Sequence, residues 1–127
     1  MAIELNHTIV WCSDQQASAQ FLAAILGRPE PVRFGRFHVV ELDNGVSLDF
    51  AERSGAIARQ HYAFLIEEED FDAVFARIRD KGLAYWADPM RSREGEINRN
   101  DGGRGVYFPD PDDHTLEVIT RPYGSGA

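Results

Sequence analysis

Hydrophobic and polar positions along the first half of the chain predict one helix among four strands. Apolar and polar residues alternate over residues 3–11, which is the period of a half-buried strand. Apolar residues then recur every three or four positions, so we expect a helix with Ser13 as its N-cap and Gly27 as its C-cap. Three short β-prone segments follow at residues 31–34, 37–42 and 46–51. The Asp-Asn-Gly run at 43–45 predicts a hairpin, because an Asn-Gly pair supplies the positive φ angles of a tight turn.

The second half of the chain repeats this order of elements. We expect a strand over residues 61–66 and a helix over residues 68–81 that ends at Gly82. Three further strands are expected at residues 83–87, 105–108 and 115–120. A Pro-Asp-Pro-Asp-Asp run at 109–113 predicts the turn between the last two strands, because Pro and Asp favour turns.

Overlaying the two halves brings chemically similar residues into correspondence. The matched positions are a strand histidine (His7 and His61), a helix-ending glycine (Gly27 and Gly82) and a strand carboxylate (Asp49 and Glu117). A shared histidine, helix end and carboxylate together indicate an internal repeat. The sequence therefore predicts an α+β fold of two βαβββ modules, residues 1–54 and 58–122, within one domain spanning residues 1–127.

Composition narrows the classes of function. The 127 residues contain 21 Asp and Glu against 13 Lys and Arg, a net charge of −8, so nucleic acid and anionic membranes are unsuitable partners. The single cysteine, Cys12, excludes an internal disulfide framework and a Cys-rich zinc module. The chain has no apolar stretch long enough to span a bilayer and no signal-like N-terminus. We therefore expect a globular protein in a reduced, cytoplasmic setting.

Four residues of the repeat have the chemistry of a metal site: His7, Asp49, His61 and Glu117. Neutral imidazole and carboxylate are ligand types that Fe(II), Mn(II), Ni(II) and Zn(II) accept. Strand alternation puts Asp49 and Glu117 on the sheet face opposite the predicted helices, where a buried carboxylate requires compensation. The alternative is that Glu117 is a solvated residue on an open sheet face and the histidines are ordinary strand residues.

The segment at 107–118, Tyr-Phe-Pro-Asp-Pro-Asp-Asp-His-Thr-Leu-Glu-Val, together with His7 and His61, resembles the vicinal oxygen chelate superfamily. That superfamily includes glyoxalase I, bleomycin-resistance proteins and extradiol dioxygenases. The resemblance covers nearly the whole chain and implies paired βαβββ modules that form a curled mixed sheet around a divalent metal ion. It also implies a small-molecule substrate whose adjacent oxygens chelate that ion, and a homodimer whose clefts are built from both chains.

The resemblance assigns roles to individual residues. His7, His61 and Glu117 are the implied metal ligands, with open positions left for a substrate oxygen pair. Asp49 stands where related enzymes carry a longer Glu or Gln. We place it with the substrate-binding residues, where it either ligates the metal directly or acts through water or a histidine. Tyr123, just beyond the last strand, is expected at the cleft mouth as a hydrogen-bond donor to substrate. No residue is assigned as a catalytic acid or base.

The leading hypothesis is a metal-dependent enzyme that acts on a small oxygenated metabolite. Lyase or isomerase chemistry, epimerisation, thiol transfer to an epoxide and ring-cleaving oxygenation are all open, because no line of the sequence chooses among them. The alternative is a drug- or metabolite-binding protein without catalysis. Bleomycin-resistance-like proteins are of this kind and typically lack the metal ligands.

Other residues near these motifs have more than one interpretation. His38 either lines the cleft or packs, His114 is expected to be a turn residue, and Cys12 is expected to be a buried apolar residue. The segment 88–104 is a candidate lid. Its arginines either bind an anionic substrate group or face solvent; they are Arg91, Arg93, Arg99 and Arg104.

Overall fold

The computed structural model describes residues 1–126, which divide into two compact units, Met1–Ala58 and a second unit that begins at Arg59. The boundary between the two units lies directly after Ala58. Residue 127, the last of the expected domain, lies outside the described residues.

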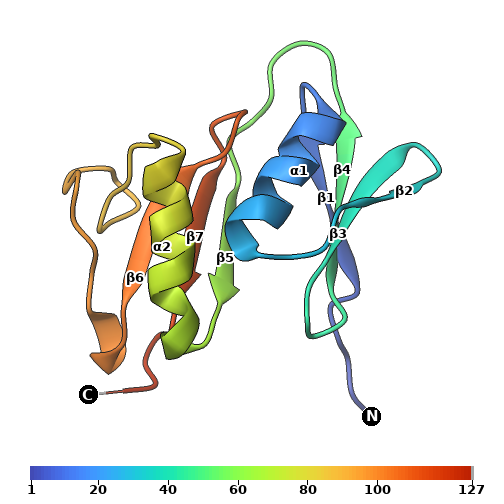
Figure 1. The fold of residues 1–127 in the computed structure, drawn as a ribbon. Helices are drawn as coiled ribbons and strands as arrows, with labels where there is room; N and C mark the ends of the chain where they lie inside the picture. Colours follow the sequence, from blue (N-terminus) through green and yellow to red (C-terminus); the bar gives the residue numbers. More distant parts are fainter. Residues whose placement is uncertain (127) are drawn as a thin grey trace. The chain divides into compact units, whose positions relative to one another are not determined.

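The first unit is a four-stranded sheet with one helix against it (Figure 1). Its elements are β1 (His7–Cys12), α1 (Gln15–Leu26), β2 (Val32–Phe34), β3 (Phe37–Glu41) and β4 (Ser47–Glu52). The strands lie in the order β1-β4-β3-β2, with β1 and β4 parallel and the other neighbours antiparallel. This is the predicted βαβββ order.

The first strand is shorter than predicted. β1 begins at His7, opposite Ser47, the first residue of β4, whereas the alternation of the sequence placed its start at residue 3. Alternation alone does not make a strand, because the backbone needs a neighbour to bond with. The backbone bonds of β4 reach only as far as Asn6, through Ser47 N to Asn6 O at 3.0 Å, and Ile3 and Leu5 are exposed.

The helix α1 ends as predicted but begins one residue later than predicted. Its N-cap is Asp14 rather than Ser13: the backbone of Asp14 is extended, and its carboxylate accepts a hydrogen bond from Ala17 N at 3.1 Å. From this position the Asp14 carboxylate reaches the backbone N–H of Ala17 in the first turn of the helix. Gly27 is the C-cap with a φ of 69°, as the sequence predicted.

The predicted hairpin between β3 and β4 is present. Leu42 N donates to Val46 O at 2.8 Å, so the loop at 43–45 closes directly onto the two strands. Gly45 has a φ of 84° and carries the left-handed position alone, which makes this a three-residue loop rather than a two-residue turn.

Strand alternation divides the residues of the first sheet between two faces. Leu48 and Phe50 of β4 are 3% and 2% exposed and face α1. Ser47 and Asp49 alternate with them on the opposite face, and His7 lies there too because it is directly across from Ser47. The predicted candidates of this module therefore share the face that α1 leaves open.

The second unit is a three-stranded sheet with one α-helix beside it (Figure 1). Its elements are β5 (His61–Leu65), η1 (Glu68–Asp70), α2 (Phe71–Asp80), η2 (Asn100–Gly102), β6 (Gly105–Pro109) and β7 (Thr115–Ile119). The strands lie in the order β5-β7-β6, with β5 parallel and β6 antiparallel to the central β7. The second unit has the element order of the first unit, except that no regular strand directly follows its α-helix.

The prediction of a strand at 83–87 is wrong. In this segment only Trp86 forms β-bridges, and they are isolated. Trp86 exchanges two backbone hydrogen bonds with Tyr107, at 2.9 and 2.8 Å, and also bridges Glu94. Immediately afterwards Ala87 N bonds to Arg93 O at 3.1 Å, so the chain turns back on itself instead of continuing along β6. The predicted helix at 68–81 is likewise divided into the 3₁₀ turn η1 and the α-helix α2.

The two faces of the second sheet also differ. Leu116 and Val118 of β7 are buried on one face, and Phe71 and Ile78 of α2 are fully buried as well. Glu117 points to the opposite face, as the alternation predicted. The first four residues of β7 are each less than a tenth exposed, so this strand forms the interior of the unit.

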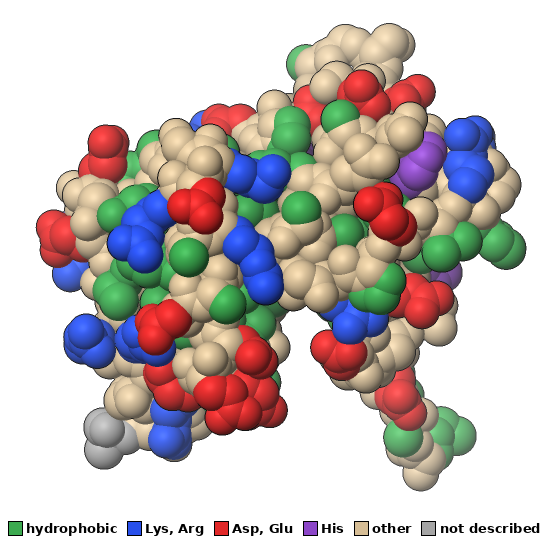
Figure 2. All heavy atoms as spheres, viewed as in Figure 1, with side chains coloured by type: hydrophobic (Ala, Val, Ile, Leu, Met, Phe, Trp, Pro, Cys, Tyr) green, Lys and Arg blue, Asp and Glu red, His purple; other side chains and the backbone are tan. Residues whose placement is uncertain are grey.

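Charged side chains of both signs share the molecular surface. On the face drawn in Figure 2, Lys and Arg side chains lie among Asp and Glu side chains, without a broad basic area. Over residues 1–126, no helix has the length and apolar character that a membrane span requires.

Candidate metal centre

His61 and Glu117 meet on the face of the second sheet opposite α2. The strands β5 and β7 are parallel neighbours, with His61 opposite Thr115 and Glu117 opposite Ala63, so both side chains project from the same face. Nε2 of His61 lies 2.9 Å from Oε1 of Glu117. The imidazole is 47% exposed, whereas the carboxylate has no exposed surface.

The Glu117 carboxylate is compensated by hydrogen bonds at both oxygens. Oε1 faces His61, and Oε2 accepts a hydrogen bond from the Tyr123 hydroxyl. The hydroxyls of Tyr123 and Tyr107 are 2.7 Å apart, and the His61 and Tyr107 rings are in tilted contact. Glu117 is therefore not the solvated residue on an open sheet face that the alternative interpretation required.

The hydroxyl of Tyr107 stays protonated at neutral pH. Burial, and secondly the adjacent Glu117 carboxylate, raise the pKa of Tyr107 well above its usual value of 10. At neutral pH the group beside the buried carboxylate is thus a neutral donor, which avoids placing two negative charges next to each other.

The open face of the first unit forms a groove of about 420 Å³. It is lined by the predicted candidates and by apolar residues of β2 and β3: Asn6, His7, Val32, Phe34, Phe37, Val39, Glu41, Ser47 and Asp49. Nδ1 of His7 lies 2.7 Å from the amide oxygen of Asn6. Because that oxygen only accepts, this contact favours the neutral tautomer with its proton on Nδ1, which leaves the lone pair that a metal ligand needs on Nε2.

Asp49 is half-buried in the same groove. The Ser47 hydroxyl donates to its Oδ1 at 3.0 Å, and on β4 Asp49 lies directly opposite Val39 of β3 and Ile9 of β1. It therefore shares a face with His7.

The donors present fit a divalent metal in kind. His61 and Glu117 place an imidazole nitrogen and a carboxylate oxygen in contact within the second unit, and the first unit carries the imidazole of His7. Within residues 1–126, no group of three or more His, Cys, Asp or Glu side chains is assembled closely enough to hold an ion. The three-ligand set of His7, His61 and Glu117 stays a prediction.

The other two histidines and the cysteine have structural roles. His38 lies on the α1 face of its sheet, with Nδ1 2.6 Å from Gln15 Oε1, so it packs rather than lining the groove. His114 is fully buried in the turn before β7, where its Nδ1 accepts a hydrogen bond from Gln60 N at 2.9 Å. Cys12 is fully buried as predicted, and its sulfhydryl lies 3.4 Å from Ala51 O.

Two arginines of the 88–104 segment are held by carboxylates. Arg104 pairs with Glu68 at 2.5 Å and Asp72 at 2.7 Å, which ties the start of β6 to η1 and α2. Nη2 of Arg91 lies 2.9 Å from Asp113 Oδ1, and its guanidinium stacks over the Trp86 ring at 4.7 Å. These two arginines serve the fold of the second unit.

Tyr107 is the residue that the sequence interpretation missed. It lies directly across from Glu117 on the antiparallel strand β6. Equal counting from the predicted turn at 109–113 would place residue 107 opposite residue 115, so the register that pairs Tyr107 with Glu117 came only from the structure. Asn6 had a simpler signal, because it stands beside His7 in the sequence and could have been recognised as a partner that orients the imidazole.

Comparison with known proteins identifies the family. Residues 4–118 match the family model of the Glyoxalase/Bleomycin resistance protein/Dioxygenase superfamily. The chain belongs to this superfamily. The resemblance noted in the 107–118 segment and the predicted α+β fold of βαβββ modules are thereby confirmed.

Within the superfamily, the chain is similar to proteins of two kinds. The solved structure of the oxidase ChaP-H1 is 61% identical, with a TM-score of 0.95, and the alignment covers 97% of this chain and 99% of that one. The glutathione transferase FosA of Serratia marcescens is 31% identical over 93% of this chain and 81% of its own length. The metallothiol transferase FosB of Bacillus licheniformis is 29% identical over 91% of this chain and 74% of its own length.

Proposed function

We propose that the chain is a metal-dependent oxidase acting on a small molecule with an adjacent pair of oxygens. The observation that carries the proposal is the contact of His61 Nε2 with Glu117 Oε1 at 2.9 Å, on a sheet face where the carboxylate is fully buried. The 61% identity to the oxidase ChaP-H1, over nearly the whole of both chains, supports oxidation rather than lyase or isomerase chemistry.

The proposed ligands are His7, His61 and Glu117. Asn6 holds the Nδ1 proton of His7, so Nε2 is ready to ligate. Nε2 of His61 lies 2.9 Å from Glu117 Oε1, so these two atoms would contribute a nitrogen and an oxygen to a bound cation. A divalent ion held there, Fe(II), Mn(II), Ni(II) or Zn(II), would polarise paired substrate oxygens and, as iron or manganese, supply redox chemistry toward dioxygen.

The groove of the first unit indicates the shape of the substrate. Phe34 is 74% exposed and Val32 is 63% exposed, and both line the groove beside the half-buried Asp49. Exposed aromatic and branched side chains at a groove favour an apolar, ring-bearing body over a small polar metabolite. We place Asp49 as a substrate-binding group at the oxygenated end of such a molecule, whereas the hydroxyl proton of Tyr123, the other substrate-binding residue predicted from the sequence, is engaged by Glu117.

Metal content tests the ligand set. Protein purified without chelator should contain about one divalent metal per chain, and His61→Ala and Glu117→Gln should each lose it, because each removes a donor from a site with few donors. His38→Ala is the matched control, since His38 bonds Gln15 on the opposite sheet face and should leave metal content unchanged. Wild-type protein without stoichiometric metal after reconstitution would contradict the proposal.

The reaction class is tested on the reconstituted protein in parallel assays. Dioxygen uptake with an o-diphenol and with a hydroxynaphthoquinone is measured beside adduct formation between glutathione and fosfomycin. We expect dioxygen uptake that Glu117→Gln abolishes. Thiol adduct formation without dioxygen uptake would replace the oxidase proposal with thiol transfer.

Thiol transfer is the second candidate, and the 31% identity to FosA over 93% of this chain favours it. Such a reaction on a phosphonate would require cationic side chains at the site. Arg104 and Arg91 are already paired with Glu68, Asp72 and Asp113, which leaves less positive charge for an anionic substrate. We therefore rank this candidate below oxidation.

The homodimer with clefts built from both chains stays a prediction. Size-exclusion chromatography with light scattering checks it directly, with about 29 kDa expected for two chains of 14.3 kDa. Binding without catalysis, the remaining alternative, predicts tight retention of an apolar ligand by protein from which metal has been removed.

A further inference from the structure

The two oxygens of Glu117 face different partners. Oε1 lies 2.9 Å from His61 Nε2, whereas Oε2 accepts a hydrogen bond from the Tyr123 hydroxyl. The carboxylate has no exposed surface, so solvent does not compete for either oxygen. One oxygen is directed at the second proposed ligand, and the other is held by a tyrosine.

Tyr107 fixes the direction in which the hydroxyls donate. Tyr123 has one hydroxyl proton and gives it to Glu117, so the 2.7 Å contact between the two hydroxyls is a donation from Tyr107 to Tyr123. Tyr107 is 5% exposed and comes from the neighbouring strand β6, so its hydroxyl has a fixed position. The result is a directed chain of donors that ends on Glu117 Oε2.

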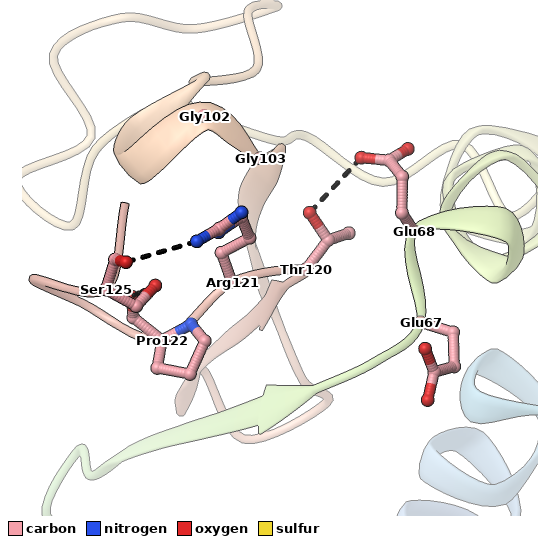
Figure 3. Close-up of a pocket in the computed structure, with 8 residues that line it drawn as sticks. All are labelled: Glu67, Glu68, Gly102, Gly103, Thr120, Arg121, Pro122 and Ser125. Atoms are coloured by element: carbon pink, nitrogen blue, oxygen red, sulfur yellow. Dashed lines mark hydrogen bonds between the residues drawn. The ribbon is translucent and has the colours of Figure 1, made fainter. Parts of the chain in front are cut away.

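Tyr123 reaches this position from outside the sheet, on the tail that follows β7. Oδ1 of Asp101 in η2 accepts a hydrogen bond from Gly124 N at 3.0 Å, the residue next to Tyr123. Within the tail, Arg121 Nη2 donates to Ser125 O at 3.1 Å, as the close-up shows (Figure 3). The tail is therefore folded on itself, and the residue that follows Tyr123 is attached to η2.

The start of the tail is also packed closely. In Figure 3 the backbone at Gly103 lies against Arg121. A Cβ at Gly103 would come within 2.5 Å of Thr120 Oγ1 and 2.9 Å of Arg121 Cγ, so only glycine permits this approach. The chain that leads to Tyr123 is thus packed closely against the end of η2.

We propose that Tyr123 is a positioning residue that makes Glu117 bind the metal through Oε1 alone. The proposal rests on the proposed metal-ligand role of Glu117. While the Tyr123 hydroxyl holds Oε2, the carboxylate does not turn to offer both oxygens to a cation. A coordination position is then kept for the substrate oxygen pair, and the attachment of the tail to Asp101 maintains the arrangement.

Metal affinity and carboxylate coordination test this proposal on the full-length protein. We expect Tyr123→Phe to bind Mn(II) roughly 10- to 100-fold more weakly by titration calorimetry, the usual effect of removing an outer partner of a ligand. The infrared spectrum of the Mn(II)-loaded wild type should show the wide carboxylate stretch separation of one-oxygen binding, and Tyr123→Phe should narrow it. Tyr85→Phe is the matched control, because the Tyr85 ring packs edge-on against Phe75 and should change neither value.

Two variants of Asp101, which does not itself contact Glu117, test whether the position of Tyr123 affects metal binding. Asp101→Ala removes the acceptor of Gly124 N and should weaken Mn(II) binding in the same direction, whereas Asp101→Asn keeps an Oδ1 acceptor and should restore it. Equal Mn(II) affinity and equal stretch separation in wild type and Tyr123→Phe would overturn the positioning role. Bidentate binding in the wild type would do so even if Tyr123→Phe did not fold.

Glu117→Gln distinguishes this failure from failure of the proposed function. If Glu117→Gln loses Mn(II) while Tyr123→Phe binds like the wild type, only the role of Tyr123 is wrong. If Glu117→Gln binds Mn(II) as tightly as the wild type, the proposed metal site itself is wrong.

Discussion

Glu117 occupies the central strand of the second sheet without any exposed surface, and its neighbours meet both of its oxygens. A buried carboxylate without partners would cost several kcal/mol. Here His61 and Tyr123 supply donors from two different segments of the chain, and Tyr107 supports Tyr123. At the residue scale, the site is a buried negative charge that hydrogen-bond donors stabilise. A divalent cation would stabilise the same charge through its own positive charge.

The N-cap of α1 gives a prediction at the same scale. Asp14→Ala removes the acceptor of Ala17 N and should lower the free energy of unfolding by about 1 kcal/mol in urea. Asp14→Asn keeps an N-cap oxygen and should remain close to the wild type. A larger loss from Ser13→Ala than from Asp14→Ala would contradict the assignment of the cap.

Among the elements, Arg104 links the start of β6 to η1 and α2. Its guanidinium bonds Glu68 and Asp72, and it stacks over the Phe71 ring at 4.4 Å. The Thr120 hydroxyl donates to Glu68 as well, at 3.2 Å (Figure 3). One carboxylate therefore connects the turn before α2 with the end of β7.

The pairing of Glu68 predicts how stability depends on pH. The hydrogen bond from Arg104 holds the pKa of Glu68 below its ordinary value of 4.5. A carboxyl whose folded pKa is lowered stabilises the fold above its unfolded pKa, and this contribution is lost as the pH falls through the folded pKa. Glu68→Gln should therefore be less stable than the wild type at pH 7, and the difference should shrink steadily below about pH 4.5.

Urea unfolding at pH 7 and at pH 3 measures this difference. Glu69→Gln, on the same 3₁₀ turn, is the control for simply removing an acidic charge. A difference between Glu68→Gln and wild type that stays constant down to pH 3 would show that Arg104 does not stabilise the carboxylate.

For the whole molecule, metal binding should be visible as stability. A ligand that binds only the folded chain raises the free energy of unfolding by about 2.7 kcal/mol at 100 times its Kd. Mn(II) at that concentration should raise the melting temperature of the wild type, and EDTA should reverse the rise. Glu117→Gln should show no such rise, and a rise equal to that of the wild type would argue for binding elsewhere.

The sequence by itself determined what depends on neighbours along the chain. The order of elements in the first unit, the Gly27 helix end and the faces of Asp49 and Glu117 were all predicted correctly. The two-residue period of a strand and the φ preference of glycine are local properties, so an isolated segment already expresses them. The repeat also associated His61 with Glu117, which the structure brings to 2.9 Å.

Only the tertiary structure decided what depends on partners distant in sequence. β1 starts where β4 is available, Trp86 bridges where Tyr107 allows it, and Tyr123 reaches Glu117 from a tail attached to Asp101. Backbone hydrogen bonds and buried charges must be satisfied by whichever groups the fold brings near. For that reason the face of the carboxylate was readable from the sequence, whereas the identity of the donors that hold it was not.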